Sequence, residues 1–329
     1  MNSRHSSKAI TVALLPVLLL SLTTGCSIRR TAVNMVGNAL ASGNSVYETD
    51  DDLELVGAAL PFGLKFMEGL LAESPDHPGL LLTSCKGFVL YSYAYVDYDA
   101  QIAEEQDLDL AAALRRRARR LYLRALKYGL RGLERSYPGF KDQLFLEPEK
   151  AVERIDGKNK KRDLPFLYWS AAALGSAISV SRDDAALLAR LPEVEAMTHR
   201  GLELDEAWGD GSFHQLMIHL AAAKVGGSDH NLIRQHYERA LGLSEGRNAG
   251  LYLDYAEAIS IPDQNRSEFY ALAEQVLAMD PDKYPENRLV NAIAQRKAQW
   301  LLDHIDELFL EGTTDSDKTT ISDLKGGQS

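Results

Sequence analysis

The chain has 329 residues, with 36 Lys and Arg against 47 Asp and Glu, so its formal net charge is −11. Its 45% hydrophobic and 25% charged residues are ordinary globular proportions, which exclude global disorder and a fibrous fold. The acidic balance disfavours a nucleic-acid partner, because phosphates would meet a repulsive field. Two cysteines are too few for a disulfide framework.

The first 25 residues have the pattern of an export signal. Arg4 and Lys8 precede an apolar stretch from Ile10 to Leu20, which at about 11 residues is shorter than the roughly 20 that a membrane-spanning helix needs. Residues 22–26, Leu-Thr-Thr-Gly-Cys, resemble a bacterial lipobox, in which a cysteine is acylated and becomes the mature N-terminus. We therefore predict lipidation at Cys26. An ordinary secretory signal with a coincidental cysteine is the alternative.

The residues after this cysteine suggest where the chain goes and how it is divided. Ser27 stands where Asp would favour retention in the inner membrane, so by analogy with lipoprotein sorting the outer membrane is favoured. We expect a lipidated N-terminus and short helix over 26–50, a helical domain over 51–311 and a disordered acidic tail over 312–329. The second cysteine, Cys85, lies in an apolar run and is expected to be buried and inert.

Apolar residues recur at three- and four-residue spacing along the body of the chain, which is typical of amphipathic helices. Gly and Pro breakers separate the helical stretches, and no hairpin signal is present. The sequence predicts an all-α fold. The expected helices are 31–43, 54–73, 79–97, 105–136, 165–180, 185–204, 211–224, 229–243, 248–260, 265–279 and 287–310.

A degenerate repeat runs through these helices. Alternate helices end in a matching pair of residues: Gly69-Leu70, Gly132-Leu133, Gly201-Leu202, Ala240-Leu241 and Val276-Leu277. The last three pairs lie 39 and 36 residues apart, close to the tetratricopeptide period of about 34. Ala221 stands where such a repeat needs a small residue for close helix contact. We predict a tetratricopeptide-like solenoid of helical pairs; chance matches among amphipathic helices are the alternative.

No catalytic or metal-binding motif emerges. His214 and His219 are five residues apart and His230 and His236 six apart, so neither pair has the i, i+4 spacing of zinc proteases. Phosphate loops, nucleophile elbows and Cys-x-x-Cys are absent from the sequence. The basic run over 115–120 follows several acidic residues and favours a solvated, ion-paired face over an anion-binding patch. We expect no catalytic residue, metal or cofactor.

Aromatic residues are the better binding candidates. Tyr91, Tyr95 and Tyr98 share one face of a helix, while Tyr93 points elsewhere, and Phe166 and Trp169 open another helix. Such spacing commonly indicates core packing. Repeat solenoids, however, present such residues along a concave surface where ligands lie, so these five are candidates for ligand or partner binding.

Several longer segments carry a family resemblance. They are Leu60-Pro61-Phe62-Gly63-Leu64, Tyr122-x-Arg124-Ala125-x-x-Tyr128-Gly129-Leu130, Tyr137-Pro138-Gly139-Phe140, Leu167-Tyr168-Trp169, Trp208-Gly209-Asp210-Gly211 and Ala298-x-Trp300-Leu301-Leu302. Over nearly all of the mature length, the chain resembles the T component (TatT) of tripartite ATP-independent periplasmic (TRAP) transporters. One departure is Leu174, where a bulky aromatic would be expected in an apolar pocket.

This resemblance implies a non-enzymatic periplasmic lipoprotein with cryptic tetratricopeptide-like repeats, forming a homotrimer pierced by pores. It also implies association with the solute-binding P component in uptake of a small ligand, with apolar ligands among the candidates. A tetratricopeptide-like scaffold for envelope assembly, without a ligand of its own, is the alternative function. A cryptic hydrolase is a third hypothesis, which a loss of turnover on changing one carboxylate or histidine would support.

Overall fold

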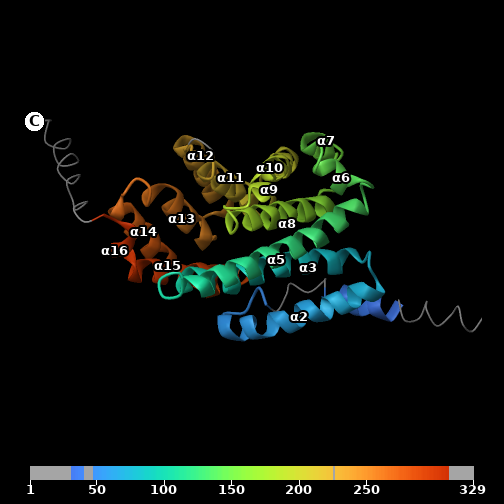
Figure 1. The fold of residues 1–329 in the computed structure, drawn as a ribbon, viewed down its shortest axis with the longest axis horizontal. Coiled ribbons are helices and arrows are strands. Elements are labelled where there is room, and N and C mark those ends of the chain that lie inside the picture. Colours follow the sequence, from blue (N-terminus) through green and yellow to red (C-terminus); the bar gives the residue numbers. More distant parts are fainter. Residues whose placement is uncertain (1–30, 41–46, 225–226, 311–329) are drawn as a thin grey trace, which may run out of the picture.

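The computed structural model describes residues 31–40, 47–224 and 227–310, and these form an all-α fold (Figure 1). No strand occurs within those ranges, so the predicted fold class is confirmed. The signal over 1–25, Cys26 and the tail over 312–329 lie outside the described residues.

Residues 31–40 are helical, and a series of helices follows them along the chain. The longer ones are α2 (Leu53–Glu73), α3 (Pro78–Tyr91), α5 (Leu108–Glu134), α8 (Lys160–Ser179), α10 (Leu191–Asp205), α11 (Ser212–Ala222), α12 (His230–Ser244), α14 (Arg266–Leu277) and α15 (Arg288–Asp303). The shorter ones are α4 (Tyr98–Ala103), α6 (Phe140–Leu144), α7 (Pro148–Glu153), α9 (Ala185–Leu188), α13 (Ala249–Tyr255), α16 (Ile305–Leu308), the 3₁₀ turns η2 (Trp208–Gly211), η4 (Pro281–Lys283) and η5 (Pro285–Asn287), and two π-helices.

Acidic and amide side chains fix where many of these helices begin. Asp52, Asp107, Asp229 and Asn265 each accept a hydrogen bond from a backbone N–H three residues further on. These N–H groups have no carbonyl partner inside the helix, so the caps stabilise the helix starts.

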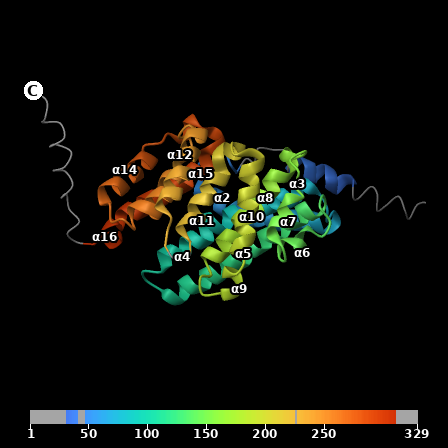
Figure 2. The same cartoon turned by 90° about the horizontal axis from the view of Figure 1, so that it is seen from above.

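Successive helices pack side by side, and the two ends of the described fold meet. The most extensive contacts join α3 to α5, α5 to α8, α8 to α10 and α11 to α12. The last long helix, α15, then packs against α2, the first (Figure 2). There the Leu289 N–H donates to the Glu48 carbonyl oxygen at 3.1 Å, and Arg288 donates to the carbonyl of Thr49 at 3.0 Å. The fold therefore closes on itself.

Small residues at the predicted repeat positions permit close helix packing. A Cβ added at Gly132 of α5 would lie 2.1 Å from the ring of Phe166 in α8, and one at Gly201 of α10 would lie 2.2 Å from the ring of Phe213 in α11. An aromatic ring of the following helix thus occupies the space over each glycine. Ala221 and Ala240 are likewise buried between α11 and α12.

Two π-helices interrupt the regular helices: η1 (Ser92–Asp97) joins α3 to α4, and η3 (Ala256–Ser260) follows α13. The sequence predicts ordinary helices there, over 79–97 and 248–260. A π turn changes which side chains share a face, and such turns frequently occur at functional sites. Both lie beside the cluster described next.

Candidate functional site: a polar recess inside the fold

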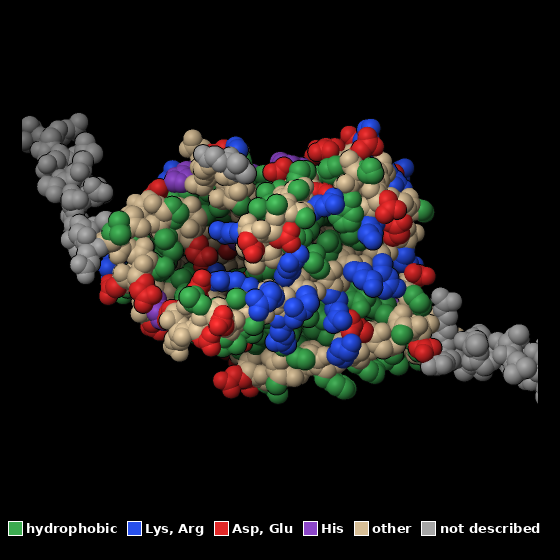
Figure 3. All heavy atoms as spheres, in the orientation of Figure 1, with side chains coloured by type: hydrophobic (Ala, Val, Ile, Leu, Met, Phe, Trp, Pro, Cys, Tyr) green, Lys and Arg blue, Asp and Glu red, His purple; other side chains and the backbone are tan. Residues whose placement is uncertain are grey.

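The face seen in Figure 3 is hollowed between α13 on one side and α5 and α8 on the other, and acidic and basic side chains lie inside the hollow. Polar side chains from seven elements gather in this part of the fold. We call this cluster the polar recess; it comprises Tyr93 and Asp97 (η1), Tyr122 (α5), Tyr168 (α8), Gln215 and His219 (α11), Asp254 (α13), Glu257 (η3) and Lys297 (α15).

Direct contacts link these side chains across the recess. The Lys297 ammonium lies 2.6 Å from a Glu257 carboxylate oxygen. Asp254 accepts a hydrogen bond from Gln215 Nε2 at 2.6 Å, and His219 Nε2 lies 3.4 Å from the same carboxylate. These contacts join α11, α13, η3 and α15 into one charged wall.

The other wall comes from η1 and α5. The Tyr122 hydroxyl lies 3.4 Å from an Asp97 carboxylate oxygen, a long hydrogen bond. The charge of Lys297 lowers the pKa of Tyr93, whereas burial and the carboxylates of Asp254, Glu257 and Asp97 raise it, and the net direction is upward. Tyr93 therefore lies within electrostatic range of both walls.

Protein surrounds the recess on several sides, but some of its side chains remain in contact with solvent. Tyr93 is 39% exposed, and the side chain of His219 is 58% exposed. Burial nevertheless pushes the pKa of Tyr93 upward and opposes protonation of His219, which is a sign of surrounding protein. Both side chains therefore keep contact with solvent while protein groups lie around them.

Charge pairing inside the recess sets the protonation of its members. The Asp254 carboxylate raises the pKa of His219. Burial alone would raise the pKa of Asp254, but His219, Gln215 and Lys297 outweigh it and hold this pKa below its ordinary value. Burial would lower the pKa of Lys297, but Glu257 and the other neighbouring charges raise it, so Lys297 stays cationic. Asp254 and Lys297 are therefore charged at neutral pH.

Asp97 differs from the other two carboxylates. Burial is the largest influence on it and raises its pKa, while Lys297, Tyr122 and Arg115 lower the pKa by less. Within the described part of the chain, no cation lies within ion-pair distance of Asp97, whose one direct side-chain partner is the Tyr122 hydroxyl. The recess therefore offers hydrogen-bond groups, aromatic rings and one carboxylate without a contacting cation. Such groups can bind a small ligand.

The predicted tyrosines occupy a neighbouring seam between η1, α2 and α15. Tyr95 donates to the carbonyl oxygen of Leu53 at 2.8 Å, and its ring packs against Tyr91. The Arg296 guanidinium stacks 4.3 Å from the ring centre of Tyr98 and 5.4 Å from that of Tyr95. All three tyrosines are half-buried, and these contacts help to hold the two ends of the fold together.

The other two aromatic candidates lie on α8. Phe166 is 3% exposed and packs over Gly132, so the structure places it in the core. Trp169 is half-buried and has the Lys86 ammonium 5.6 Å above its ring. Leu174, the departure from the family pattern, is buried in the same core. The structure does not bring Phe166 to an exposed surface.

Sequence reasoning missed Tyr93 and Asp97, the residues of η1 that face the recess. The sequence singles out the face with Tyr91, Tyr95 and Tyr98 and sets Tyr93 aside as pointing elsewhere. That geometry is correct, but the side away from the seam is the one that meets Lys297 and Asp254. The available signal was a tyrosine and an aspartate four residues apart, each next to small or apolar residues of the same predicted helix.

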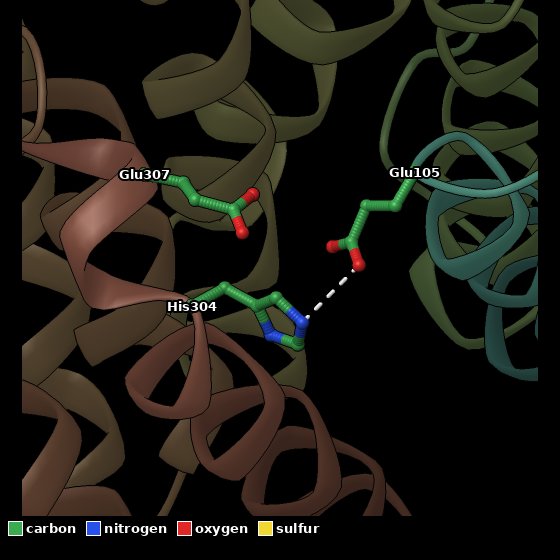
Figure 4. Close-up of side chains that lie close together, drawn as sticks. All are labelled: Glu105, His304 and Glu307. Atoms are coloured by element: carbon green, nitrogen blue, oxygen red, sulfur yellow. Dashed lines mark ion pairs between the residues drawn. The ribbon is translucent and has the colours of Figure 1, made fainter.

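A second cluster of possible metal ligands lies where α15 ends. Nε2 of His304 lies 3.3 Å from a Glu105 oxygen, and the Glu307 carboxylate points into the same space (Figure 4). His304 Nδ1 lies 2.7 Å from the Trp300 carbonyl oxygen. That backbone contact, followed by the neighbouring carboxylates, raises the pKa of His304. The ion pair between His304 and Glu105, which joins the C-terminal helices to the loop after α4, explains why these side chains lie together.

Two other sequence interpretations are confirmed. Arginines of the basic run on α5 pair with acids, Arg115 with Glu104 and Arg119 with Asp184, as expected of an ion-paired face. Cys85 is fully buried, as predicted, and burial raises the pKa of its thiol far above the ordinary value, which disfavours the reactive thiolate.

Comparison with known proteins gives two findings. Residues 49–309 match the family model described as TRAP transporter T-component. The chain is also 28% identical over 306 residues to a protein of Treponema pallidum (strain Nichols) described only as uncharacterised, covering 88% of this chain and 95% of that protein. The matched family segment includes every member of the polar recess.

Proposed function

This chain belongs to the TRAP transporter T-component family, whose model matches residues 49–309, and on this basis we propose that it functions in transport. Members of this family are transporter accessory proteins of the periplasm. Our proposal is that the chain binds a TRAP-type solute-binding protein, the P component, and holds or passes on the small ligand which that protein carries. The polar recess is the place we assign to this ligand.

The observation that carries this proposal is the polar recess, in which side chains from seven elements gather around one hollow (Figure 3). A plain scaffold has no need for it, because burying charged groups costs free energy unless they are paired or meet a ligand. Both π-helices contribute side chains to it, which is consistent with selection for function over regularity. A tetratricopeptide-like scaffold without a ligand remains the alternative.

The outer face of α2 supports an assembly of several copies. Among the described residues α2 is the one helix long and apolar enough to cross a membrane by length and composition, yet one side of it packs in the core through Leu64, Met67 and Leu71. The other side exposes stacked rings of Phe62 and Phe66, with Phe62 77% exposed. Exposed apolar patches commonly mark interfaces. We propose that this face joins the copies of a homotrimer.

We further propose that the mature chain is tethered through lipidated Cys26, in the outer membrane. Cys26→Ser should abolish acylation and release the protein from the membrane fraction, because one polar residue cannot replace several acyl chains in hydrocarbon. Fractionation followed by immunoblotting measures this. Unchanged membrane association of the variant would contradict the lipid anchor and favour the ordinary secretory signal.

The proposed partnership is tested with purified components. The TRAP-type solute-binding protein of the same organism is titrated against the immobilised chain, and a solute-binding protein of another transporter class serves as the control. Saturable binding of the first and none of the second supports the proposal. If neither binds, while the chain co-purifies with envelope assembly proteins, the scaffold alternative takes its place.

A further inference from the structure

We propose that the polar recess binds a small polar molecule through a protonated amine, with the carboxylate of Asp97 as its counter-ion and the hydroxyl of Tyr93 as a hydrogen-bond partner. The proposal rests on the proposed function in one respect, that the recess receives a ligand. It goes further by naming the chemical class of that ligand.

The first step is to ask which charges in the recess already have partners. Lys297 is paired with Glu257 at 2.6 Å, and Asp254 is held by Gln215 at 2.6 Å and by His219 at 3.4 Å. Within the described ranges, the direct side-chain partner of Asp97 is the neutral hydroxyl of Tyr122, at 3.4 Å. Among the described residues it is therefore the recess carboxylate that lacks a cation in contact.

The second step is the free hydrogen-bond capacity beside this carboxylate. Tyr93 and Asp97 lie four residues apart on the same π-helix, and both retain access to solvent. Of the hydrogen bonds made within the described ranges, none involves the Tyr93 hydroxyl. A ligand ammonium has three donors, so it can serve the Asp97 carboxylate and the Tyr93 oxygen together.

The third step excludes the other ligand classes. An anion would need a free cation, but the ammonium of Lys297 is already neutralised by Glu257, and three carboxylates surround it against one imidazole. An apolar ligand would displace water from Asp97 and Tyr93 without replacing the hydrogen bonds, which is costly. An amine replaces them and adds charge attraction in a partly desolvated site, where such attraction is strong.

The experiment uses four probes of similar length: 1,4-diaminobutane, 4-amino-1-butanol, 1,4-butanediol and succinate. Each is titrated into the mature protein in detergent by isothermal titration calorimetry. We expect the two amines to bind and the diol and succinate to give no saturable heat. Preferential binding of succinate, or equal behaviour of all four probes, would overturn the proposal without reference to any variant.

Variants then locate the site. Asp97→Asn should weaken binding of 1,4-diaminobutane at least tenfold, while Asp99→Asn, which changes an exposed carboxylate two residues further on in α4, should change it less than twofold. Tyr93→Phe should weaken binding severalfold, and it provides a second readout if Asp97→Asn does not fold by circular dichroism. Full affinity in both Asp97→Asn and Tyr93→Phe would place the amine elsewhere and refute the assignment.

The result separates this inference from the proposed function. Binding of the solute-binding protein is measured on the same samples, and we expect Asp97→Asn and Tyr93→Phe to retain it. If the complex forms but no amine binds, only the ligand class is wrong. If amines bind in the recess but the solute-binding protein does not bind to the chain, the proposed partnership is wrong and the proposed amine site is supported.

Discussion

Lys297 and Glu257 form an ion pair of 2.6 Å that joins α15, the last long helix, to the π-helix η3. The Lys297 side chain is only 13% exposed, so its charge depends on this partner. The same ammonium acts on Tyr93, Asp97, His219 and Asp254. One lysine thus acts on all three recess carboxylates, although its single positive charge is paired directly with Glu257.

Removing that lysine should destabilise the fold. Lys297→Met leaves Glu257 and its neighbouring carboxylates without their cation, and we expect a loss of about 2 kcal/mol, below the value for a fully buried pair because Glu257 is partly exposed. The double variant Lys297→Met with Glu257→Gln should recover about half of this loss. Urea unfolding at pH 7 measures both; a double variant no more stable than the single one would contradict the pairing argument.

The glycines of α5 and α2 should respond in opposite directions to the same change. Gly132→Ala would push a Cβ to 2.1 Å from the Phe166 ring and should destabilise the protein by about 2 kcal/mol through overpacking. Gly69→Ala meets nothing within 4 Å and should stabilise α2 by roughly 0.5–1 kcal/mol, because alanine is the better helix former. Equal shifts in urea unfolding for the two variants would show that the close approach at Gly132 does not matter.

The same glycine pattern shows what sequence alone could predict. The helix spacing, the breakers and the small residues before Leu133 and Leu202 are local features, so the all-α class and the close contacts at Gly132 and Gly201 could be anticipated. The short helices α6 and α7 were missed, because five or six residues carry too little periodicity. Helix α8 also begins at Lys160, with Pro165 inside it, five residues before the predicted start.

The polar recess could not be predicted in this way. It joins Tyr93 to Lys297 across the closure of α15 onto α2, and no spacing rule connects residues so far apart in the chain. A π-helix also changes which side chains share a face, and the regular helical spacing over 79–97 did not predict one at η1. The site depends on the packing of α15 against α2 and on the π-helices, and local sequence patterns predict neither feature.

Stability should fall below neutral pH because of His236. Burial, followed by the charges of His214 and His199, lowers the pKa of His236 from 6.5 to about 4. Its Nδ1 lies 2.7 Å from Nδ1 of His214, and two such nitrogens can share only one proton. Between pH 6.5 and 4 the unfolded chain therefore binds more protons at His236 than the folded chain does. The contribution of His236 to the free energy of unfolding is fully present above pH 6.5 and is lost as the pH falls towards 4.

The measurement is urea unfolding at pH 7 and pH 5. Because His236 is partly exposed, we expect it to contribute a loss of about 1 kcal/mol over this range, and His236→Gln should show a correspondingly smaller loss. Gln235→Ala, an exposed neighbour on α12, serves as the control and should keep the parental pH dependence. An unchanged slope in His236→Gln would assign the acid sensitivity to other groups.

The apolar outer face of α2 gives the last prediction, which concerns assembly. Phe62 is 77% exposed and stacks on Phe66, with 6.2 Å between the ring centres, while the opposite side of α2 lies in the core. Replacing a surface phenylalanine by glutamate should cost little stability, because the side chain remains in water. The same charge buried in an interface between copies would meet an apolar surface without a partner and should weaken association strongly.

We therefore expect Phe62→Glu to keep the parental unfolding midpoint and to shift the protein from trimer to monomer in light scattering after gel filtration. Lys127→Glu, at an exposed position of α5, is the control, since it introduces the same residue on another helix. If Phe62→Glu remains a trimer but loses the solute-binding protein, the face belongs to that partner. If it leaves the membrane fraction with Cys26 intact, the face contacts lipid; either result would refute the assignment of α2 to the contact between copies.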